Sequence, residues 1–368
     1  FISSLPPVKL GGSVAYTFRT QQSGETPREY GNLVTGSILG ASYIWQPWFT
    51  TVDGNLNLTQ EMTTGGTSET DSIVATGYAN VNVLPLSNFP TSLSYLRSDS
   101  TVDGTLFTSQ TTTQRGSIRN RLYFPDPRLT ISTTGALENT ERLSFGEEEA
   151  VMASVDVNKG FETSTVNAIL RHDQSTFTST SATSTGSDRV NDLANFRHDY
   201  QPFENVYVQS SSTVLKSEET VQNADRSTFF IQGVTSGQWR PGEIPVTVNG
   251  ALRTLTQALE VASSTTDTQS VAGTVGANYV IAPRLTTNLG LNGTFSSVKT
   301  SAGAESGETS ASNSQTQDAT ASAGINYNSL DTELAGFNWN WNTAAQSQAG
   351  YSSQGEGAGV VSSVNSFS

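Results

Sequence analysis

The chain contains no cysteine, and only two of its 368 residues are histidine. The lack of cysteine excludes disulfides, thiolate metal sites and c-type haem attachment within this chain. Charged residues are also scarce, at 14%, whereas ordinary soluble domains have roughly a quarter. A polar chain of this kind could be disordered, but disordered chains usually have few aromatic residues. The 5 Trp, 11 Tyr and 16 Phe therefore indicate that this chain packs or anchors its side chains.

Positive charge is in the minority, with 19 Lys and Arg against 33 Asp and Glu, which gives a net charge of −14. No basic stripe is present to neutralise phosphates, so the sequence predicts no nucleic-acid partner. The acidic balance also disfavours docking on an anionic lipid surface by charge. No run of about 18 consecutive apolar residues occurs, so no transmembrane helix is predicted. Because the chain starts at Phe1, we expect either a removed signal peptide or a fragment.

Alternation of apolar and polar residues is the dominant pattern, and it predicts β-strands. In 271–281, Val271, Val275 and Tyr279 share one face, and small or polar residues occupy the other. In 285–295 the leucines alternate with threonine and asparagine in the same way. Only the tripeptide 282–284, which includes a proline, separates the two runs. The two segments are therefore predicted to form a tight antiparallel hairpin.

The hairpin recurs along the chain with a period of about forty residues. Short turns are predicted at 45–48, 85–90, 124–128, 158–162, 201–205, 240–245, 282–284 and 328–333. Long polar loops are predicted between them, for example at 21–32, 63–71, 174–188 and 300–317. This arrangement predicts about 18 strands (16 to 20 or more) of roughly 10–14 residues, against a typical five or six residues in globular proteins.

A closed transmembrane β-barrel accounts for the long strands, the short turns at one end and the long polar loops at the other. A strand tilted by about 45° crosses the hydrocarbon with about 9–11 residues. Backbone polar groups inside a bilayer must all be paired, so the sheet has to close. The predicted fold class is therefore all-β: a transmembrane antiparallel up-and-down β-barrel with short periplasmic turns and long polar extracellular loops.

Aromatic residues crowd the short turns, where polar residues and glycine are normally favoured. An aromatic ring is favoured at a membrane–water boundary, so such turns are predicted to lie at one. The predicted membrane-interface aromatics are Trp45, Trp48, Phe49, Phe89, Tyr123, Phe124, Tyr200, Phe203, Trp239, Tyr279 and Tyr327.

In its period, turn asymmetry and aromatic placement, the chain resembles a Gram-negative outer-membrane β-barrel of the porin-like kind. The resemblance extends from about Lys9 to Val364 and carries no motif of a specific family. It implies a bacterial outer-membrane location, with the lipid bilayer and its lipopolysaccharide as the surroundings. Residues 1–8 are interpreted as a lead-in segment and 9–368 as a single barrel domain. Because Phe367 is followed by Ser368 and the last strand is weak, further C-terminal strands are possible.

If the apolar parity faces lipid, the opposite parity faces a lumen dominated by Ser, Thr and Asn. The segment 334–342 is interpreted as one such strand, with Phe337, Trp339 and Trp341 facing out. A barrel of 16–18 strands leaves an aqueous channel rather than a filled core. The predicted lumen-lining residues are Arg115, Arg119, Arg121, Arg253, Asn80, Asn82, Asn249, Asn288, Asn292, Asn338 and Asn340.

One strand, 114–124, breaks the neutrality of the predicted lumen with an arginine row, Arg115, Arg119 and Arg121. One interpretation is an electropositive stripe that orients solutes or grips an acidic partner. The other is an ordinary set of lumen charges balanced by acidic residues such as Glu138 or Asp156. The sequence favours the second interpretation.

No motif predicts chemistry. His172 and His198 each adjoin an aspartate, so a Ser-His-Asp hydrolase is conceivable. An interfacial histidine is the favoured interpretation, because His198 lies between Phe196 and Tyr200 in parity and adjoins a turn. The acidic run 147–149 lacks the spacing of an EF-hand, and 355–359 lacks the βαβ context of a dinucleotide loop. The chain is therefore predicted to be no enzyme and to hold no metal or cofactor.

Three functions remain open at this stage. The first is an aqueous pore for passive passage of small hydrophilic solutes. The second is a sleeve or scaffold for a protein partner in the lumen or periplasm, such as a secretion component, a lipoprotein or a cytochrome. The third is a soluble cell-surface β-repeat adhesin, since a period near forty also occurs in propeller blades. The sequence favours the pore and leaves the oligomeric state undetermined.

Overall fold

The structure is a computed structural model of the chain, and the regular elements among the residues that it describes are all β-strands. It describes residues 6–21, 28–65, 68–105, 108–125, 128–143, 145–180, 186–221, 224–242, 244–261, 264–303, 309–329, 332–334, 337–339, 342–355 and 360–367. Within these ranges, no helix has the length and apolar character needed to span a membrane.

Among the described residues, eighteen strands follow one another as an up-and-down meander in a single sheet, which confirms the predicted fold class and strand number. The first nine are β1 (Lys9–Gln21), β2 (Glu29–Ile44), β3 (Thr50–Gly65), β4 (Ser68–Val83), β5 (Thr91–Gly104), β6 (Thr108–Phe124), β7 (Leu129–Arg142), β8 (Gly146–Gly160) and β9 (Ser164–Ser179). The others are β10 (Ser187–Phe203), β11 (Val206–Val221), β12 (Ala224–Trp239), β13 (Val246–Val261), β14 (Ser264–Ala282), β15 (Leu285–Gly303), β16 (Thr309–Asn328), β19 (Asn342–Gln354) and β20 (Val360–Phe367).

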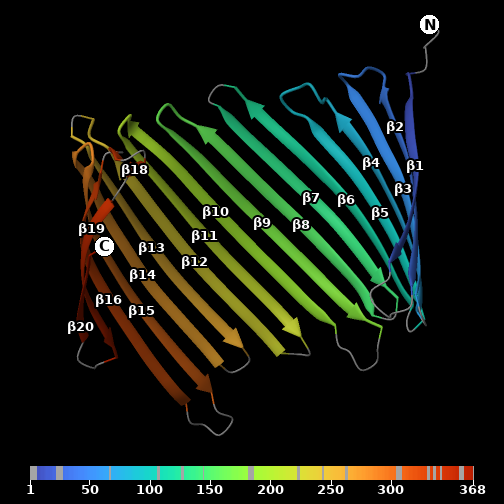
Figure 1. The fold of residues 1–368 in the computed structure, drawn as a ribbon. Helices are drawn as coiled ribbons and strands as arrows, with labels where there is room; N and C mark the ends of the chain where they lie inside the picture. The colour runs from blue at the N-terminus through green and yellow to red at the C-terminus, as the bar shows by residue number, and fades with distance from the viewer. Residues whose placement is uncertain are drawn as a thin grey trace. The chain divides into compact units, whose positions relative to one another are not determined.

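The chain divides into two compact units, and each is described by itself. The first comprises Phe1–Val157, Leu170–Asn191 and Glu219–Asn223, and the second comprises Asn158–Ile169, Asp192–Glu218 and Ala224–Ser368. In the first unit, β1 to β7 pair in sequence and antiparallel, without a register shift. In the second unit, β12 to β16 lie side by side in chain order (Figure 1), and β16 pairs with β19.

The predicted hairpin between 271–281 and 285–295 is confirmed as the β14–β15 pair. Val271 lies opposite Phe295, and Val275 lies opposite Leu291, so the apolar residues of the two strands share a face. The register shifts only between Val280 and Ala282, beside the turn. The alternation seen in the sequence therefore specifies the register, because a slip of one residue would move every leucine to the other face.

Three of the segments predicted as long loops, 63–71, 174–188 and 300–317, are more than half strand, so the prediction is wrong for these three. Residues 22–27 of the fourth, 21–32, lie outside the described residues. Strand β3 continues to Gly65 and β4 begins at Ser68, so most of 63–71 is paired. Similarly, β15 runs to Gly303 and β16 starts at Thr309. Apart from β20, the eighteen strands contain 13 to 20 residues. Threonine suits a strand whether or not its face is apolar, so the ladders continue after the apolar alternation stops.

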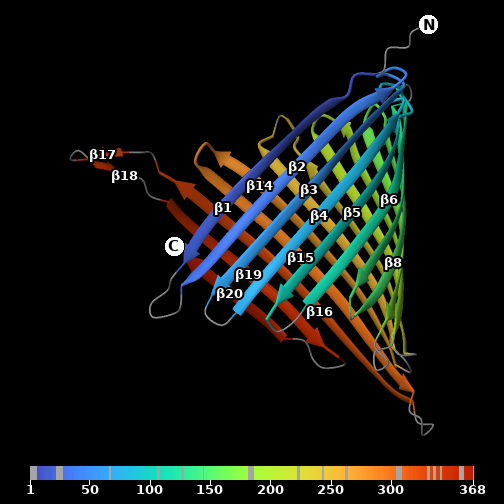
Figure 2. The same cartoon turned by 90° about the vertical axis from the view of Figure 1, so that its right-hand side faces the viewer.

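The prediction that 334–342 forms one strand of the barrel is also wrong. Thr332–Leu334 (β17) and Phe337–Trp339 (β18) pair with each other in a separate two-stranded sheet. Figure 2 shows this small hairpin standing away from the long strands. The next long strand, β19, begins only at Asn342. Asn338 therefore belongs to β18, while Asn340 and Trp341 lie outside the described residues. An alternation of aromatic residues with asparagine fits a short hairpin as well as a long strand of the barrel.

The described residues contain almost no buried apolar core. Ala136 is the only one of their hydrophobic residues that is buried, and it is 7% exposed. Large apolar side chains are instead exposed along the strands, as at Leu56, Val275 and Leu291. A water-soluble chain of this length would bury most such residues. The exposed apolar face therefore matches a sheet whose solvent on that side is lipid, and it argues against the soluble adhesin.

Candidate functional site

The register assigns every strand residue of a unit to one of two faces, because residues opposite each other across an antiparallel pair share a face. In the first unit, Asn82 lies opposite Thr51 on β3 and Ser92 on β5, and Ser92 lies opposite Arg119 on β6. We call the face that carries these residues the polar face. The opposite face, with Leu56, Leu93 and Ile118, is the apolar face.

Side chains on the polar face of the first unit bond to one another across the strands. The Asn82 amide donates to Thr51 Oγ1 over 3.3 Å, and the Ser92 hydroxyl donates to Asn82 Oδ1 over 2.7 Å. In the next row the Asn80 amide donates to Asp53 Oδ2 over 3.4 Å. Ser94 and Ser117 are also hydrogen-bonded. The predicted lumen residues Asn80 and Asn82 thus belong to a surface of polar side chains that hydrogen-bond across neighbouring strands.

All three members of the arginine row lie on this polar face. Arg115 lies opposite Glu138, and its Nη1 is 3.8 Å from Glu138 Oε2. Arg119 lies between Ser92 and Thr134, and Arg121 lies opposite Ser132. The interpretation of balanced lumen charges therefore applies to Arg115 and Glu138. Among the described residues, Arg119 and Arg121 make no side-chain hydrogen bond or ion pair.

The second unit has a corresponding polar face. Asn249 and Arg253 lie two rows apart on β13, and the register places Asn288 and Asn292 on the same side. The Gln238 amide donates to Asn249 Oδ1 over 3.0 Å. Nine of the eleven predicted lumen residues therefore lie on the polar face of their own unit: Asn249, Arg253, Asn288 and Asn292 in the second unit, and Asn80, Asn82, Arg115, Arg119 and Arg121 in the first. That this face lines a lumen remains a prediction.

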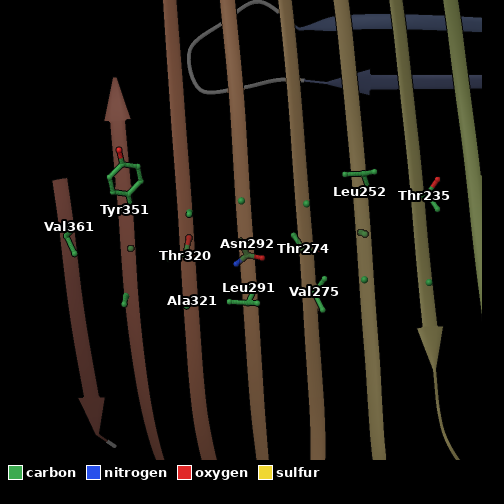
Figure 3. Close-up of a pocket in the computed structure, with 18 of the residues that line it drawn as sticks. Thr235, Leu252, Thr274, Val275, Leu291, Asn292, Thr320, Ala321, Tyr351 and Val361 are labelled. Carbon is green, nitrogen blue, oxygen red and sulfur yellow. The ribbon is translucent and has the colours of Figure 1, made fainter. Parts of the chain in front are cut away.

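The apolar face of the second unit holds a shallow depression of about 950 Å³. Its floor is rich in glycine and alanine, including Gly250, Gly273 and Ala321, and larger side chains such as Leu252 border it. Figure 3 shows Leu291, Val275 and Tyr351 among its side chains, on strands that run side by side. The lining offers little to bind a polar solute, so the depression forms part of the lipid-facing surface.

The predicted interface aromatics gather at the end of the strands where the short turns lie. Trp45, Trp48 and Phe49 form one cluster with ring centroids 5.2–6.2 Å apart. Phe89 meets Phe124 from the next short turn at 6.0 Å, edge to face. Trp45 has a φ of 67°, which is unusual for a residue with a side chain, and its ring is largely exposed. An exposed aromatic cluster in a turn is typical of a membrane boundary.

The remaining aromatics lie in β6, β10, β12, β14 and β16, close to their short-turn ends. Tyr200 and Phe203 belong to β10, and Trp239 is the last residue of β12. Tyr279 and Tyr327 lie on the apolar face near the ends of β14 and β16. Tyr123 differs from Tyr279 and Tyr327, because its register places it on the polar face together with Arg121.

Removing the tryptophan cluster is expected to weaken the anchoring of this turn. For the double substitution Trp45→Ala and Trp48→Ala we expect a loss of about 1–2 kcal/mol in the free energy of unfolding from vesicles, since aromatic pairs add energy beyond their buried area. Urea unfolding, followed by the gel-mobility difference between folded and unfolded chain, measures the change. The control Trp45→Phe keeps a ring beside Phe49 and should lose far less; equal losses for both variants would contradict the assignment.

Sequence reasoning missed an ion-paired cluster near the short-turn end of β10 and β11. Arg197 Nε lies 2.9 Å from Asp199 Oδ2, and the Tyr207 hydroxyl donates to Asp199 Oδ1 over 2.9 Å. Arg171 and Asp173 on β9 repeat the arrangement, with 2.6 Å between Nε and Oδ2. The available signal was Arg and Asp two residues apart in a strand, which places both on one face.

The motifs set aside at the sequence level have local partners. Glu147 Oε1 accepts a hydrogen bond of 2.6 Å from the Asn139 amide, and Glu148 pairs with Arg142 at 3.4 Å. The His198 ring stacks on Tyr200 at 5.8 Å. The described residues contain no group of three His, Cys, Asp or Glu placed to hold a metal ion.

No family model and no curated protein matches the chain. Among solved structures, it is similar to the siderophore receptor PirA from Acinetobacter baumannii (8% identity, TM-score 0.46, 98% of this chain and 73% of that one). It is also similar to a bacterial polysaccharide outer membrane secretin (12%, 0.30, 84% and 96%). A third similar structure is a loop-deletion mutant of OmpT, an outer membrane protein of Vibrio cholerae (8%, 0.25, 98% and 97%).

At these identities and TM-scores, the similarities do not indicate a function for the chain. The class rests on the structure itself: an all-β meander of long antiparallel strands with one polar and one exposed apolar face and an aromatic end. This is the architecture of a bacterial outer-membrane β-barrel.

Proposed function

We propose that the chain forms an aqueous pore in the bacterial outer membrane for the passive passage of small hydrophilic solutes. The observation that carries the proposal is the polar face. Its hydroxyl and amide groups, in rows such as Thr51, Asn82 and Ser92, would line the channel when the sheet closes around it. Neutral hydrogen-bonding groups replace part of a solute's hydration without binding it tightly, which suits passage rather than capture.

The exposed apolar face supports the same proposal from the other side. A strand needs about 9–11 residues to cross a bilayer, and the long strands exceed that length. Their apolar positions cluster toward the aromatic end, so we propose that the polar remainder of each strand extends beyond the membrane. A sleeve around a protein partner is the second candidate function. We propose no catalytic step.

Planar-bilayer conductance of the detergent-purified chain tests the pore. We expect stable open steps on the order of a nanosiemens, as an aqueous lumen of a barrel with about 18 strands requires. Chain that inserts into vesicles and resists external protease but conducts nothing would contradict the open pore. It would favour the sleeve, and a partner co-purifying in stoichiometric amount from the outer membrane would support that alternative.

A further inference from the structure

Arg119 and Arg121 of the arginine row have no ion-pair partner among the described residues. Other cations on the polar face of the first unit do have one. Arg19 Nη2 lies 2.7 Å from Glu61 Oε1, and Arg115 is paired with Glu138. The residues opposite Arg119 and Arg121 are hydroxyl residues: Ser92, Thr134 and Ser132. The described structure therefore leaves two guanidinium groups on the polar face without a carboxylate partner.

The acidic groups around this pair are distant or already engaged. Asp53 lies three strands away in the register, about 14 Å at the usual strand spacing. Its Oδ2 accepts the hydrogen bond from Asn80. Glu138 lies four residues along β7 from Thr134, about 13 Å away. Asp156 lies on β8, beyond β7, and makes an interaction of its own. At about 13–14 Å, the charges of Asp53 and Glu138 are largely screened from the pair at physiological salt.

The spacing of the pair suits a small oxyanion. Residues two apart on one strand face are about 6.7 Å apart at their Cα atoms, so both guanidinium groups can reach one anion between them. Each guanidinium can donate two parallel hydrogen bonds to a phosphate or carboxylate. The hydroxyls of Ser132 and Thr134 stand on the adjoining strand β7 as further donors. The Ser92 hydroxyl already donates to Asn82.

We infer that Arg119 and Arg121 form a binding site for small oxyanions on the polar face, with phosphate-bearing solutes as the ligand class. The inference rests on the proposed pore for its physiological meaning, because there the site would select anions in a chain whose net charge is −14. As a binding site, it stands on the arginine pair alone and is testable without conductance.

The test measures binding of inorganic phosphate to the refolded, detergent-solubilised full chain by ³¹P NMR line broadening, with the conductance of the same preparations measured in parallel. The test variant is Arg119→Gln with Arg121→Gln. The control is Arg115→Gln with Glu138→Gln, which removes a charge pair from the same face, with Arg115 on the same strand and Glu138 on β7, without changing the net charge. A second comparison, Arg119→Lys with Arg121→Lys, keeps the charge but loses the bidentate geometry. The gel-mobility difference between folded and unfolded chain verifies that each variant folds.

We expect the test variant to bind phosphate about tenfold more weakly or worse, because it loses two charge-assisted bidentate contacts. The control should bind as the native chain does, and the lysine variant should fall between the two. No binding to the native chain, or equal binding to the test variant, would overturn the inference. Phosphate binding that depends on the two arginines in a chain that conducts nothing would uphold the site and refute the pore.

In a conducting chain, the same substitutions should shift the reversal potential in a salt gradient. The native pore should pass chloride more readily than its net charge suggests, and the test variant should move toward cations. A test variant with the native reversal potential would refute the site's role in anion selectivity, whereas the phosphate-binding measurement decides the site itself.

Discussion

Replacing Leu291 by arginine is expected to destabilise the folded chain in a bilayer by about 2–4 kcal/mol, the cost of arginine on the lipid side of a strand near the bilayer midplane. Leu291 lies on the apolar face between Val275 and Ala321 and is 61% exposed. Urea unfolding from phospholipid vesicles measures the change. In detergent micelles, which adapt to a charged side chain, the loss should be smaller.

The matched control is the next residue of the same strand. Asn292→Arg places the same side chain on the polar face between Thr274 and Thr320. If that face meets water, the control should unfold within about 1 kcal/mol of the native chain. Equal losses at the two positions would contradict the assignment of the faces.

Gly146 is expected to tolerate no side chain. Its φ is 143°, and a Cβ placed there would run into the Thr178 carbonyl oxygen and the Phe177 ring. For Gly146→Ala we expect a loss of about 3 kcal/mol or more in the free energy of unfolding, because backbone strain and a clash with rigid neighbours add. The same vesicle unfolding assay measures it.

Gly116 provides the control for Gly146. It lies on the apolar face of β6 opposite Leu137, and a Cβ there would meet nothing within 4 Å. Gly116→Ala should be neutral or stabilise the chain by up to about 1 kcal/mol, since alanine loses less conformational freedom in a strand. If the two alanine variants unfold alike, the strain assigned to Gly146 is refuted.

The sequence predicted the part of the fold that alternation encodes. The segments 271–281 and 285–295 alternate strictly, so both the hairpin and its apolar face follow from the residues. The aromatic cluster in the turn at Trp45 and Trp48 was predictable because large rings are unusual in a tight turn but are favoured at a membrane–water boundary.

The extent of the strands was not predictable in the same way. In 63–71 the residues are threonine, glycine, serine and acids, a composition equally common in loops. They are paired because neighbouring strands continue beside them, which is information in the register rather than in the segment. The prediction for 337–339 is wrong for the opposite reason. Its residues do alternate and do form a strand, but that strand pairs with β17 and not with a long strand of the main sheet.

The polar-face residues were predictable in kind but not in their partnerships. Parity alone placed Arg115, Arg119 and Arg121 on one face. It could not show that Glu138 lies opposite Arg115 while hydroxyl residues flank the other two. Nor could it join Arg19 to Glu61, which are 42 residues apart in sequence. These contacts depend on the register of particular strand pairs.

Site-directed spin labelling along β15 tests most directly whether the strands separate lipid from water. Because the chain has no cysteine, each single-cysteine variant from 288 to 292 carries one label on the refolded protein in vesicles. Labels at Leu289 and Leu291 should be relaxed mainly by oxygen, which concentrates in lipid. Labels at Asn288 and Asn292 should be relaxed mainly by a water-soluble nickel reagent. Equal access of the nickel reagent to all five positions would contradict a membrane-spanning strand with one polar and one apolar face.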